Sequence, residues 1–350
     1  MSETVVTKAV FGRLPDGGEV EIFTMKNDVA EARVMSWGAR LVSLKTKDRE
    51  GVLADISLGY DKLEEWLVDR PHFGSTIGRF GNRIALGKFT LDGVEYQLPI
   101  NNGPNSLHGG PLGFDKLPWT AKQVPDGVEL TLVSPDGDAG YPGTLTVKTT
   151  YTLVGSELRL KYHAVTDKAT ILNLTNHSYF NLRGDDRGDV ADTVVTIYAD
   201  KYLPTDEGQI PTGEVASVEG TPMDLRSPQV VSKLWDDTSF EPLRIGEGFD
   251  HMWIVNGEPG TMRPMAEAYL PETGRVLTVK STEPGMQFYT GNHLTGAFTG
   301  RHGQVYAVRT GFCFETQGYP DAPNHANFPS TVLRPGEVFA SETVYGFGVR

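Results

Sequence analysis

The chain has 350 residues, with 32 Lys and Arg against 45 Asp and Glu, a formal net charge of −13, and 39% hydrophobic residues. This is the composition of an ordinary globular protein, which excludes a disordered or fibrous one, and a single cysteine excludes an intrachain disulfide. The acidic balance argues against a nucleic-acid partner, because affinity for phosphate backbones comes largely from clustered Lys and Arg. No window approaches the roughly 18 apolar residues of a membrane span, and the first residues do not resemble a signal peptide. We therefore expect a cytoplasmic protein with no membrane or nucleic-acid partner.

Alternation of apolar and polar residues predicts short strands from one end of the chain to the other. Residues 144–153 and 157–164 alternate around a Gly155-Ser156 turn and predict an antiparallel hairpin, and residues 89–91 and 94–96 do the same around Asp92-Gly93. Further strands are expected at residues 19–25, 128–133, 194–199, 276–281 and 305–315. Helices are expected only at residues 61–68 and after Ser227-Pro228, where Ser suits the N-cap and Pro the first helical position.

The 40 glycines and 22 prolines are spread along the whole chain, which favours many short elements joined by turns. Many short strands with Gly and Pro turns are typical of a sandwich or barrel. The fold prediction is a single all-β domain over residues 1–350, a large antiparallel β-sandwich with few short helices. Because length alone suggests about two domains of roughly 150 residues, two β-domains are the alternative.

The sequence lacks the usual motifs for nucleotides and metals: GxGxxG after a strand, GxxxxGK[ST], HExxH and CxxC. GxSxG is also absent. Cys313 lies between two phenylalanines with no basic neighbour, which predicts a buried, inert thiol. We therefore expect neither a metal nor a cofactor.

A polar residue inside an apolar strand segment needs a hydrogen-bond partner or indicates a function. In residues 169–182, a period of two places Asn173, Thr175, His177 and Tyr179 on one face. Every residue of that face can form hydrogen bonds, as a ligand site requires. The alternative is that His177 is a structural histidine whose hydrogen bonds are made inside the core.

Glu315 ends the expected strand 305–315, behind the small residues Gly311 and Cys313, which leave room for a ligand. Apolar surroundings should raise the pKa of this carboxyl toward the range of a useful base, whereas a strand-end glutamate in solvent is the alternative. Asp250 and Gln287 are likewise polar residues flanked by bulky apolar ones.

Two glycine-containing loops, residues 78–83 and 105–110, place Asn82, Arg83 and His108 where a ligand could approach the backbone closely, although structural turns are the alternative. His251 is expected to support Asp250 at most. Carboxylates, amides, imidazoles and an arginine with aromatic residues nearby are the mixture that a sugar requires. The remaining histidines lack this context: His72, His163, His293, His302 and His325.

Together the motifs resemble those of the aldose 1-epimerase family, also called galactose mutarotases. The resemblance covers the chain from about residue 10 to its end, in family order. It is carried by the segments IGRFGNRI (77–84), NSLHGG (105–110), LTNHSYFNL (174–182), GFDH (248–251), PGMQFYTGN (284–292), GFCFETQ (311–317) and FPSTVLRPG (328–336).

The resemblance implies a galactose mutarotase-like supersandwich with a sugar cleft, and ring opening and closure of a free hexose without metal or cofactor. Glu315 matches the family's catalytic base and His177 its catalytic acid. The matches to substrate-binding residues are Asn82, Arg83, His108, Asp250 and Gln287. Gly81 stands where Ala is often found, which removes only a methyl group. The assignment requires residues 177 and 315 to meet across one cavity, at a gap that a single pyranose spans.

Three other functions stay open at this stage. A glycosidase could pair Asp250 with Glu315 as its two carboxylates, and a non-catalytic sugar-binding module could use the same cleft. A hexose-6-phosphate epimerase would need a phosphate-binding Arg or Lys near the cleft. The preferred aldose and the assembly, monomer or homodimer, are left open.

Overall fold

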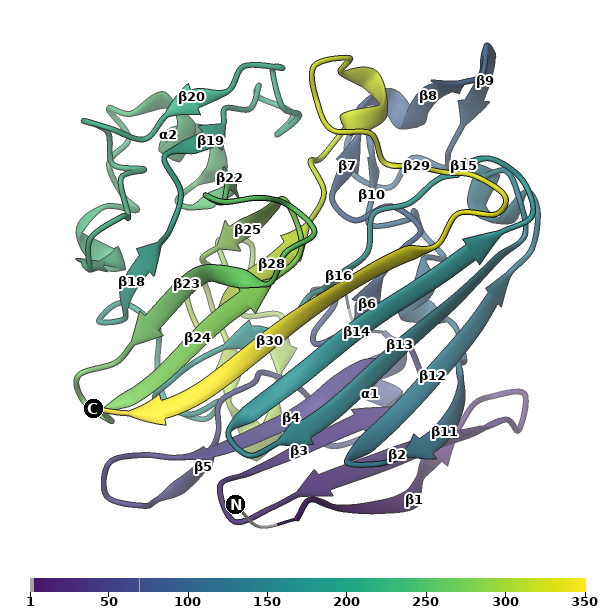
Figure 1. Ribbon diagram of the computed structural model, residues 1–350. Helices are drawn as coiled ribbons and strands as arrows, with labels where there is room; N and C mark the ends of the chain where they lie inside the picture. Colours follow the sequence, from purple (N-terminus) through teal and green to yellow (C-terminus); the bar gives the residue numbers. More distant parts are fainter. Residues whose placement is uncertain (1–2, 69) are drawn as a thin grey trace.

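The computed structural model describes residues 3–68 and 70–350. Within these ranges the chain forms three large antiparallel sheets, five two-stranded ladders and two short α-helices (Figure 1). The expected all-β fold with few short helices is confirmed. None of the helices in the described part of the chain has the length and apolar character needed to cross a membrane.

The three large sheets contain strands from all parts of the chain. The five-stranded sheet follows chain order: β1 (Val5–Arg13), β2 (Glu19–Lys26), β3 (Ala30–Met35), β4 (Arg40–Lys47) and β5 (Leu53–Asp55). The nine-stranded sheet has the order β11 (Thr120–Val124), β12 (Gly127–Ser134), β13 (Leu145–Val154), β14 (Glu157–Thr166), β30 (Phe339–Val349), β24 (Arg275–Ser281), β23 (Arg263–Tyr269), β18 (Val194–Ile197) and β21 (Gln229–Val230). The six-stranded sheet has the order β17 (Tyr179–Phe180), β28 (Phe312–Gln317), β25 (Gly285–Tyr289), β22 (Asp250–Ile254), β19 (Lys201–Leu203) and β20 (Ala216–Ser217).

Shorter elements connect the sheets. The ladders are β6 (Thr76–Ile77) with β16 (Thr175–Asn176), β7 (Arg83–Ile84) with β10 (Ser106–Leu107), β8 (Lys88–Leu91) with β9 (Val94–Gln97), β15 (Thr170–Ile171) with β29 (Val332–Leu333), and β26 (Phe298–Thr299) with β27 (Val305–Tyr306). The helices are α1 (Leu63–Leu67) and α2 (Glu241–Gly246), with 3-10 turns at Ala85–Gly87, Phe114–Lys116, Asp138–Gly140, Val231–Lys233, Arg301–Gly303 and Ala322–Asn324.

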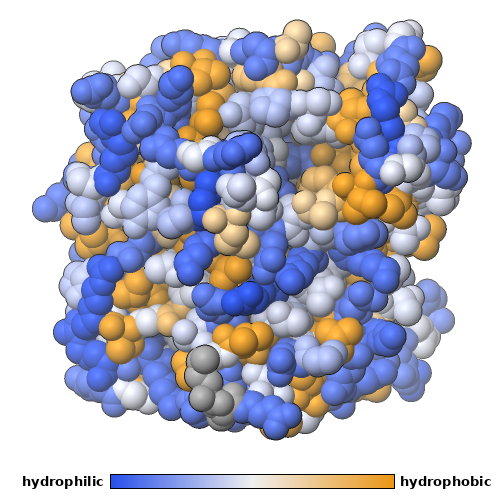
Figure 2. Space-filling model, viewed as in Figure 1, coloured by the Kyte–Doolittle hydropathy of each residue, from blue (hydrophilic) through white to orange (hydrophobic). Residues whose placement is uncertain are grey.

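The β13–β14 hairpin shows how the alternating sequence produces a buried face. Inward side chains such as Leu145 and Val147 are fully buried, whereas Lys161 and His163 on the other face are exposed. Val154 pairs with Glu157 across the two-residue turn, as the sequence predicted. The face of the molecule that carries this sheet is mostly hydrophilic, with hydrophobic residues in scattered groups (Figure 2).

One hydrophobic core is shared by the three sheets. Phe23 of β2, Val147 of β13 and Phe288 of β25 all belong to it and are completely buried. The inner faces of the sheets therefore pack against one another, and β25 and β28 lie side by side in the interior as paired strands.

Two segments expected to be single strands are interrupted, and those expectations were wrong. The segment 305–315 divides into β27 and β28, because Arg309 adopts a φ of +68° and Thr310 hydrogen-bonds back to the carbonyl of Ala307. Glu315 consequently lies within β28, not at the end of a strand. The segment 169–182 divides into β15, β16 and β17, which pair with different partners.

The helix predictions had mixed outcomes. Helix α1 lies within the expected range 61–68, although its N-cap is Lys62. No α-helix begins at Ser227-Pro228: the chain enters β21, whose Val230 pairs with Val194 at the edge of the nine-stranded sheet, and the 3-10 turn at Val231–Lys233 follows. Pairing with β18 provides hydrogen bonds for the backbone groups there, and this outweighs the helix-start signal of Ser227 and Pro228. Helix α2 was not expected from the sequence.

Candidate active site

A cavity of about 400 Å³ opens beside the six-stranded sheet, within the range of roughly 300–1,000 Å³ common for small-molecule sites. Six of the seven site residues expected from the sequence line it: Asn82, Arg83, His108, His177, Asp250 and Glu315. The seventh, Gln287, lies next to this wall.

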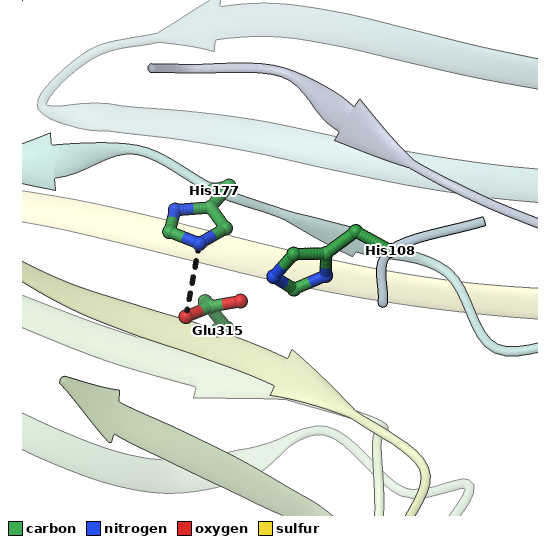
Figure 3. A group of neighbouring side chains, drawn as sticks. All are labelled: His108, His177 and Glu315. Atoms are coloured by element: carbon green, nitrogen blue, oxygen red, sulfur yellow. Dashed lines mark ion pairs between the residues drawn. The ribbon is translucent and has the colours of Figure 1, made fainter. Parts of the chain in front are cut away.

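Glu315 and His177 face each other in this cavity (Figure 3). Oε1 of Glu315 lies 3.7 Å from Nε2 of His177, and both side chains are almost completely buried. Glu315 comes from β28 and His177 from the connection between β16 and β17, which are brought together because β17 pairs with β28. The requirement that residues 177 and 315 share one cavity is therefore met.

The ring of His177 is held on several sides. Its backbone amide donates to Ser75 at 2.9 Å, and the ring stacks on Tyr179 with centroids 5.1 Å apart. Nδ1 lies 3.6 Å from the sulfur of Cys313, which is buried as expected and whose pKa burial raises well above its ordinary value. Burial lowers the pKa of His177 to about 3, with a further contribution from His72.

Burial also raises the pKa of Glu315 well above its ordinary value, and the nearby carboxylate of Asp250 adds to the effect while Arg83 opposes it. Oε2 of Glu315 is buried and has no hydrogen-bond partner among the described residues. A buried acceptor without a hydrogen-bond partner is uncommon in proteins, and a bound ligand could supply the missing hydrogen bond.

Asp250 is fixed by its neighbours on the sheet. Gln287 lies opposite Glu315 in the register of β25 and β28, and its amide nitrogen donates to Oδ1 of Asp250 at 2.7 Å. The backbone amide of Asp250 donates to Nδ1 of His251, which is completely buried. His251 thus supports Asp250, as the sequence suggested.

Two hydrogen bonds join Asn82 and His108. The amide of Asn82 donates to Nδ1 of His108 at 3.1 Å, and the amide of His108 donates to the carbonyl of Asn82 at 3.0 Å. Burial keeps the pKa of His108 well below its ordinary value, so the ring is neutral. Because Nδ1 accepts a hydrogen bond, the single ring proton is on Nε2, and His108 is a donor at that atom.

Arg83 projects from β7 into the same cavity. Its Nε donates to Asn102 at 2.9 Å, and a terminal nitrogen donates to Gln209. Burial lowers the pKa of the Arg83 guanidinium below its ordinary value, and the nearby carboxylate of Asp250 opposes this shift. These contacts orient a fork of donors in the cavity wall.

Comparison with known proteins now identifies the family. The profile of the aldose 1-epimerase family matches residues 21–346. The chain is 49% identical to the galactose mutarotase of Bos taurus and 48% identical to that of Homo sapiens, over 98% of this chain and 99% of each relative. The chain belongs to the aldose 1-epimerase family. It is also 36% identical to the aldose 1-epimerase of Escherichia coli (strain K12), over 95% of this chain and 96% of that protein.

Solved structures agree with this membership of the aldose 1-epimerase family. The structure of galactose 1-epimerase from Lactobacillus acidophilus NCFM superposes with a TM-score of 0.85 at 28% identity and covers 99% of both chains. The aldose epimerase homologue from C. elegans superposes with a TM-score of 0.84 at 29% identity, covering 92% of this chain and 97% of that one. The expected galactose mutarotase-like fold is confirmed.

A metal fits this aldose 1-epimerase site poorly. Donor atoms of His108, His177 and Glu315 lie within 4.8 Å of one another, a spacing that could suggest three ligands. The amide of Asn82 occupies Nδ1 of His108, however, and Nε2 then carries the ring proton and has no lone pair for a metal. The absence of a metal or cofactor stays a prediction.

The aldose 1-epimerase cavity has further walls that the sequence did not reveal. His72 and His293 were set aside, yet both line it, together with Arg70, Asn102, Tyr289 and Phe298. Gln209, which holds Arg83, was not expected either. Apart from Tyr289, which lies inside a family motif, the sequence carries no local signal for them, because only the fold brings their segments to the cavity.

Proposed function

We propose that this protein is an aldose 1-epimerase that interconverts the α and β anomers of a free hexose, with Glu315 as the base and His177 as the acid. The observation that carries the proposal is the opposition of Glu315 Oε1 and His177 Nε2 at 3.7 Å in the cavity wall. The names of the mammalian relatives favour galactose as a substrate.

Glu315 takes the proton of the C1 hydroxyl while His177 gives a proton to the ring oxygen. The electrons of that O–H bond form the carbonyl as the bond between C1 and the ring oxygen breaks, and the open-chain aldehyde results. Rotation about C1–C2 presents the other carbonyl face, and the reverse transfers close the ring. One proton leaves the sugar and one enters it, so the reaction needs no oxidant or co-reactant.

The two catalytic groups hold one proton between them during this cycle. Before ring opening the pair is Glu315 carboxylate with protonated His177, and afterwards it is neutral Glu315 with neutral His177. Burial favours the neutral pair, since the pKa of Glu315 is raised and that of His177 is lowered to about 3. The site therefore favours the protonation state that accompanies the open-chain sugar over the charged pair from which ring opening starts.

The other site residues bind and position the sugar. His108 donates from Nε2, and Arg83 offers its guanidinium near the ring-oxygen region. Asp250, held by Gln287, and Asn82 hold hydroxyls so that the open chain stays in place. Positioning of this kind prevents escape of the aldehyde between opening and closure.

Arg70 favours a second candidate, the hexose-6-phosphate epimerase. It is exposed at the cavity and makes no ion pair with another described residue. An arginine in this place can contact an anionic group on the sugar. The single-domain organisation over residues 1–350, the cytoplasmic location and the monomer or homodimer state remain predictions, and one shared core supports the first of these.

A proton NMR time course tests the proposal on freshly dissolved α-galactose, α-glucose and their 6-phosphates, each with and without protein. Faster anomer equilibration of the free sugars is expected. Acceleration confined to the 6-phosphates would select the second candidate. Binding without acceleration would select a sugar-binding module. In a parallel incubation with a glycoside, release of reducing sugar would select a glycosidase.

A further inference from the structure

His72 lies in the wall of the sugar cavity and takes no part in the proposed proton transfers. It belongs to the loop between α1 and β6, and its side chain is 13% exposed. Its ring centroid is 5.8 Å from that of His177 and 5.1 Å from that of His108. The cavity therefore contains a third imidazole directly beside the two histidines assigned to the reaction.

The backbone of His72 is held in an unusual conformation. Its φ is +65°, in the left-handed region that residues other than glycine rarely adopt. Asn82 and His108, which also line the cavity, have φ values of +63° and +52°. The backbone amide and hydroxyl of Ser75 both donate to the carbonyl of His72. Such conformations persist where the surroundings enforce them, and they cluster at functional sites.

Asp115 determines the orientation of the His72 ring. Its Oδ2 lies 2.9 Å from Nδ1 of His72, and the carboxyl is completely inaccessible to solvent. Arg40 and Lys116 lie 3.7 and 3.6 Å from the same oxygen. Despite burial, His72 and these two cations hold the pKa of Asp115 far below its ordinary value, so that it is a carboxylate.

An ionised carboxylate can only accept hydrogen bonds. Nδ1 of His72 must therefore carry a proton and donate it to Asp115. Nε2 is the ring's second polar atom, and it has no hydrogen-bond partner among residues 3–68 and 70–350. The pair with Asp115 thus leaves Nε2 available to a molecule in the cavity.

We propose that His72 is a further substrate-binding residue, oriented by Asp115, whose Nε2 hydrogen-bonds a sugar hydroxyl other than the anomeric one. The proposal rests on the proposed function, because Glu315, His177 and His108 take the reacting oxygens. The ring of His72 lies beside the rings of His177 and His108. A pyranose whose reacting oxygens contact those residues can present a hydroxyl next to the anomeric centre to His72. In this position His72 helps to determine which hexose configuration the cavity accepts.

Two variants separate the two nitrogens of the ring. His72→Asn keeps a donor for Asp115 near the place of Nδ1 and removes Nε2, whereas His72→Gln places an amide nearer to Nε2. His163→Asn is the matched control, since this histidine is exposed on the outer face of β14. Thermal unfolding and circular dichroism check that each variant folds like the wild type.

The experiment measures kcat and KM for galactose and for its 2-, 3-, 4- and 6-deoxy analogues. The wild-type rates come first: if none of the sugars equilibrates faster with the protein, the proposed function fails and not merely this inference. His72→Asn should raise KM for galactose about 3- to 10-fold with little change in kcat, as expected for one lost hydrogen bond. His72→Gln should recover part of that loss, and His163→Asn should match the wild type.

The deoxy sugars distinguish a contact from a structural role. If Nε2 binds one hydroxyl, the ratio of KM between His72→Asn and wild type should return to about one for the single analogue that lacks this hydroxyl. An equal rise in KM for all four analogues, or no rise for galactose, would overturn the proposal while leaving the epimerase activity intact.

Discussion

Gln287 and Glu315 lie directly opposite each other on β25 and β28, and the amide nitrogen of Gln287 donates to Asp250 on the next strand at 2.7 Å. Three residues distant in sequence are thereby aligned across adjacent strands. Both Oε1 of Gln287 and Oε2 of Glu315 are buried and have no hydrogen-bond partner among the described residues. A bound sugar can satisfy acceptors of this kind with its hydroxyls, which connects the register of the sheet to the proposed chemistry.

The first prediction concerns the link between Gln287 and Asp250. Gln287→Met keeps the length of the side chain and removes the donor that holds Oδ1 of Asp250. We expect KM for galactose to rise about 3- to 10-fold while kcat changes little, because a positioned hydroxyl contact is weakened. Steady-state polarimetry measures both. Unchanged KM would show that Asp250 is held without this bond.

The second prediction addresses the base. Glu315→Gln keeps the shape of the side chain and cannot accept the proton of the C1 hydroxyl. Turnover should fall about 10²- to 10⁴-fold, the usual contribution of one positioned base, and sugar binding should be retained. Polarimetry gives the rate and calorimetry the affinity. Near-normal rates in this variant would remove Glu315 from the role of base.

The third prediction concerns Glu283, which is buried between β24 and β25. Burial raises the pKa of its carboxyl to about 7, so the folded protein retains a proton that the unfolded chain releases near pH 4.5. Between these values the folded state binds more protons, and the free energy of unfolding must fall as pH rises. The loss is on the order of 3 kcal/mol across this window.

Glu283→Gln removes this titration. Compared with wild type, the variant should gain relative stability from pH 4.5 to pH 7, as measured by urea unfolding at several pH values. The difference between the two proteins isolates Glu283 from the other carboxyls. A constant difference across the window would contradict a raised pKa at this residue.

The fourth prediction compares two glycines with similar backbones. Gly109, next to His108, has a φ of +82°, and a Cβ there would lie 2.0 Å from the carbonyl oxygen of Gly78. Gly93 has a φ of +80°, and a Cβ there would meet nothing within 4 Å. Gly93→Ala should cost about 1–2 kcal/mol from conformational strain alone.

Gly109→Ala adds a steric collision to the same strain, and we expect it to cost about 4 kcal/mol or more and to lower activity by displacing His108. Chemical denaturation of both variants gives the two costs. Equal costs would mean that the loop around Gly109 can shift without penalty.

Local sequence predicted those parts of the fold whose information is local. The hairpins at residues 89–96 and 144–164 were predicted because alternation and a two-residue turn specify both strands and their register. The helix expected after Ser227 does not form, for the opposite reason. The backbone there pairs with β18 at the edge of the nine-stranded sheet, and the local sequence contains no sign of this distant strand.

The candidate site follows the same division. His177, Glu315 and their proposed companions could be selected from the sequence, since polar residues in apolar strands and the family motifs mark them individually. The break in the segment 305–315 could not be predicted from the sequence, because it is supported by contacts of Arg309 with Thr290 and Glu247, which are distant along the chain.

By itself, the sequence determined an all-β fold, the aldose epimerase resemblance and the residue types of the site. Tertiary structure alone decided that Glu315 meets His177 at 3.7 Å, that Gln287 stands behind Asp250, and that Asp115 turns His72 toward the cavity from 43 residues away. Side-chain chemistry and periodicity are properties of short segments, whereas these distances depend on how three sheets pack around one core.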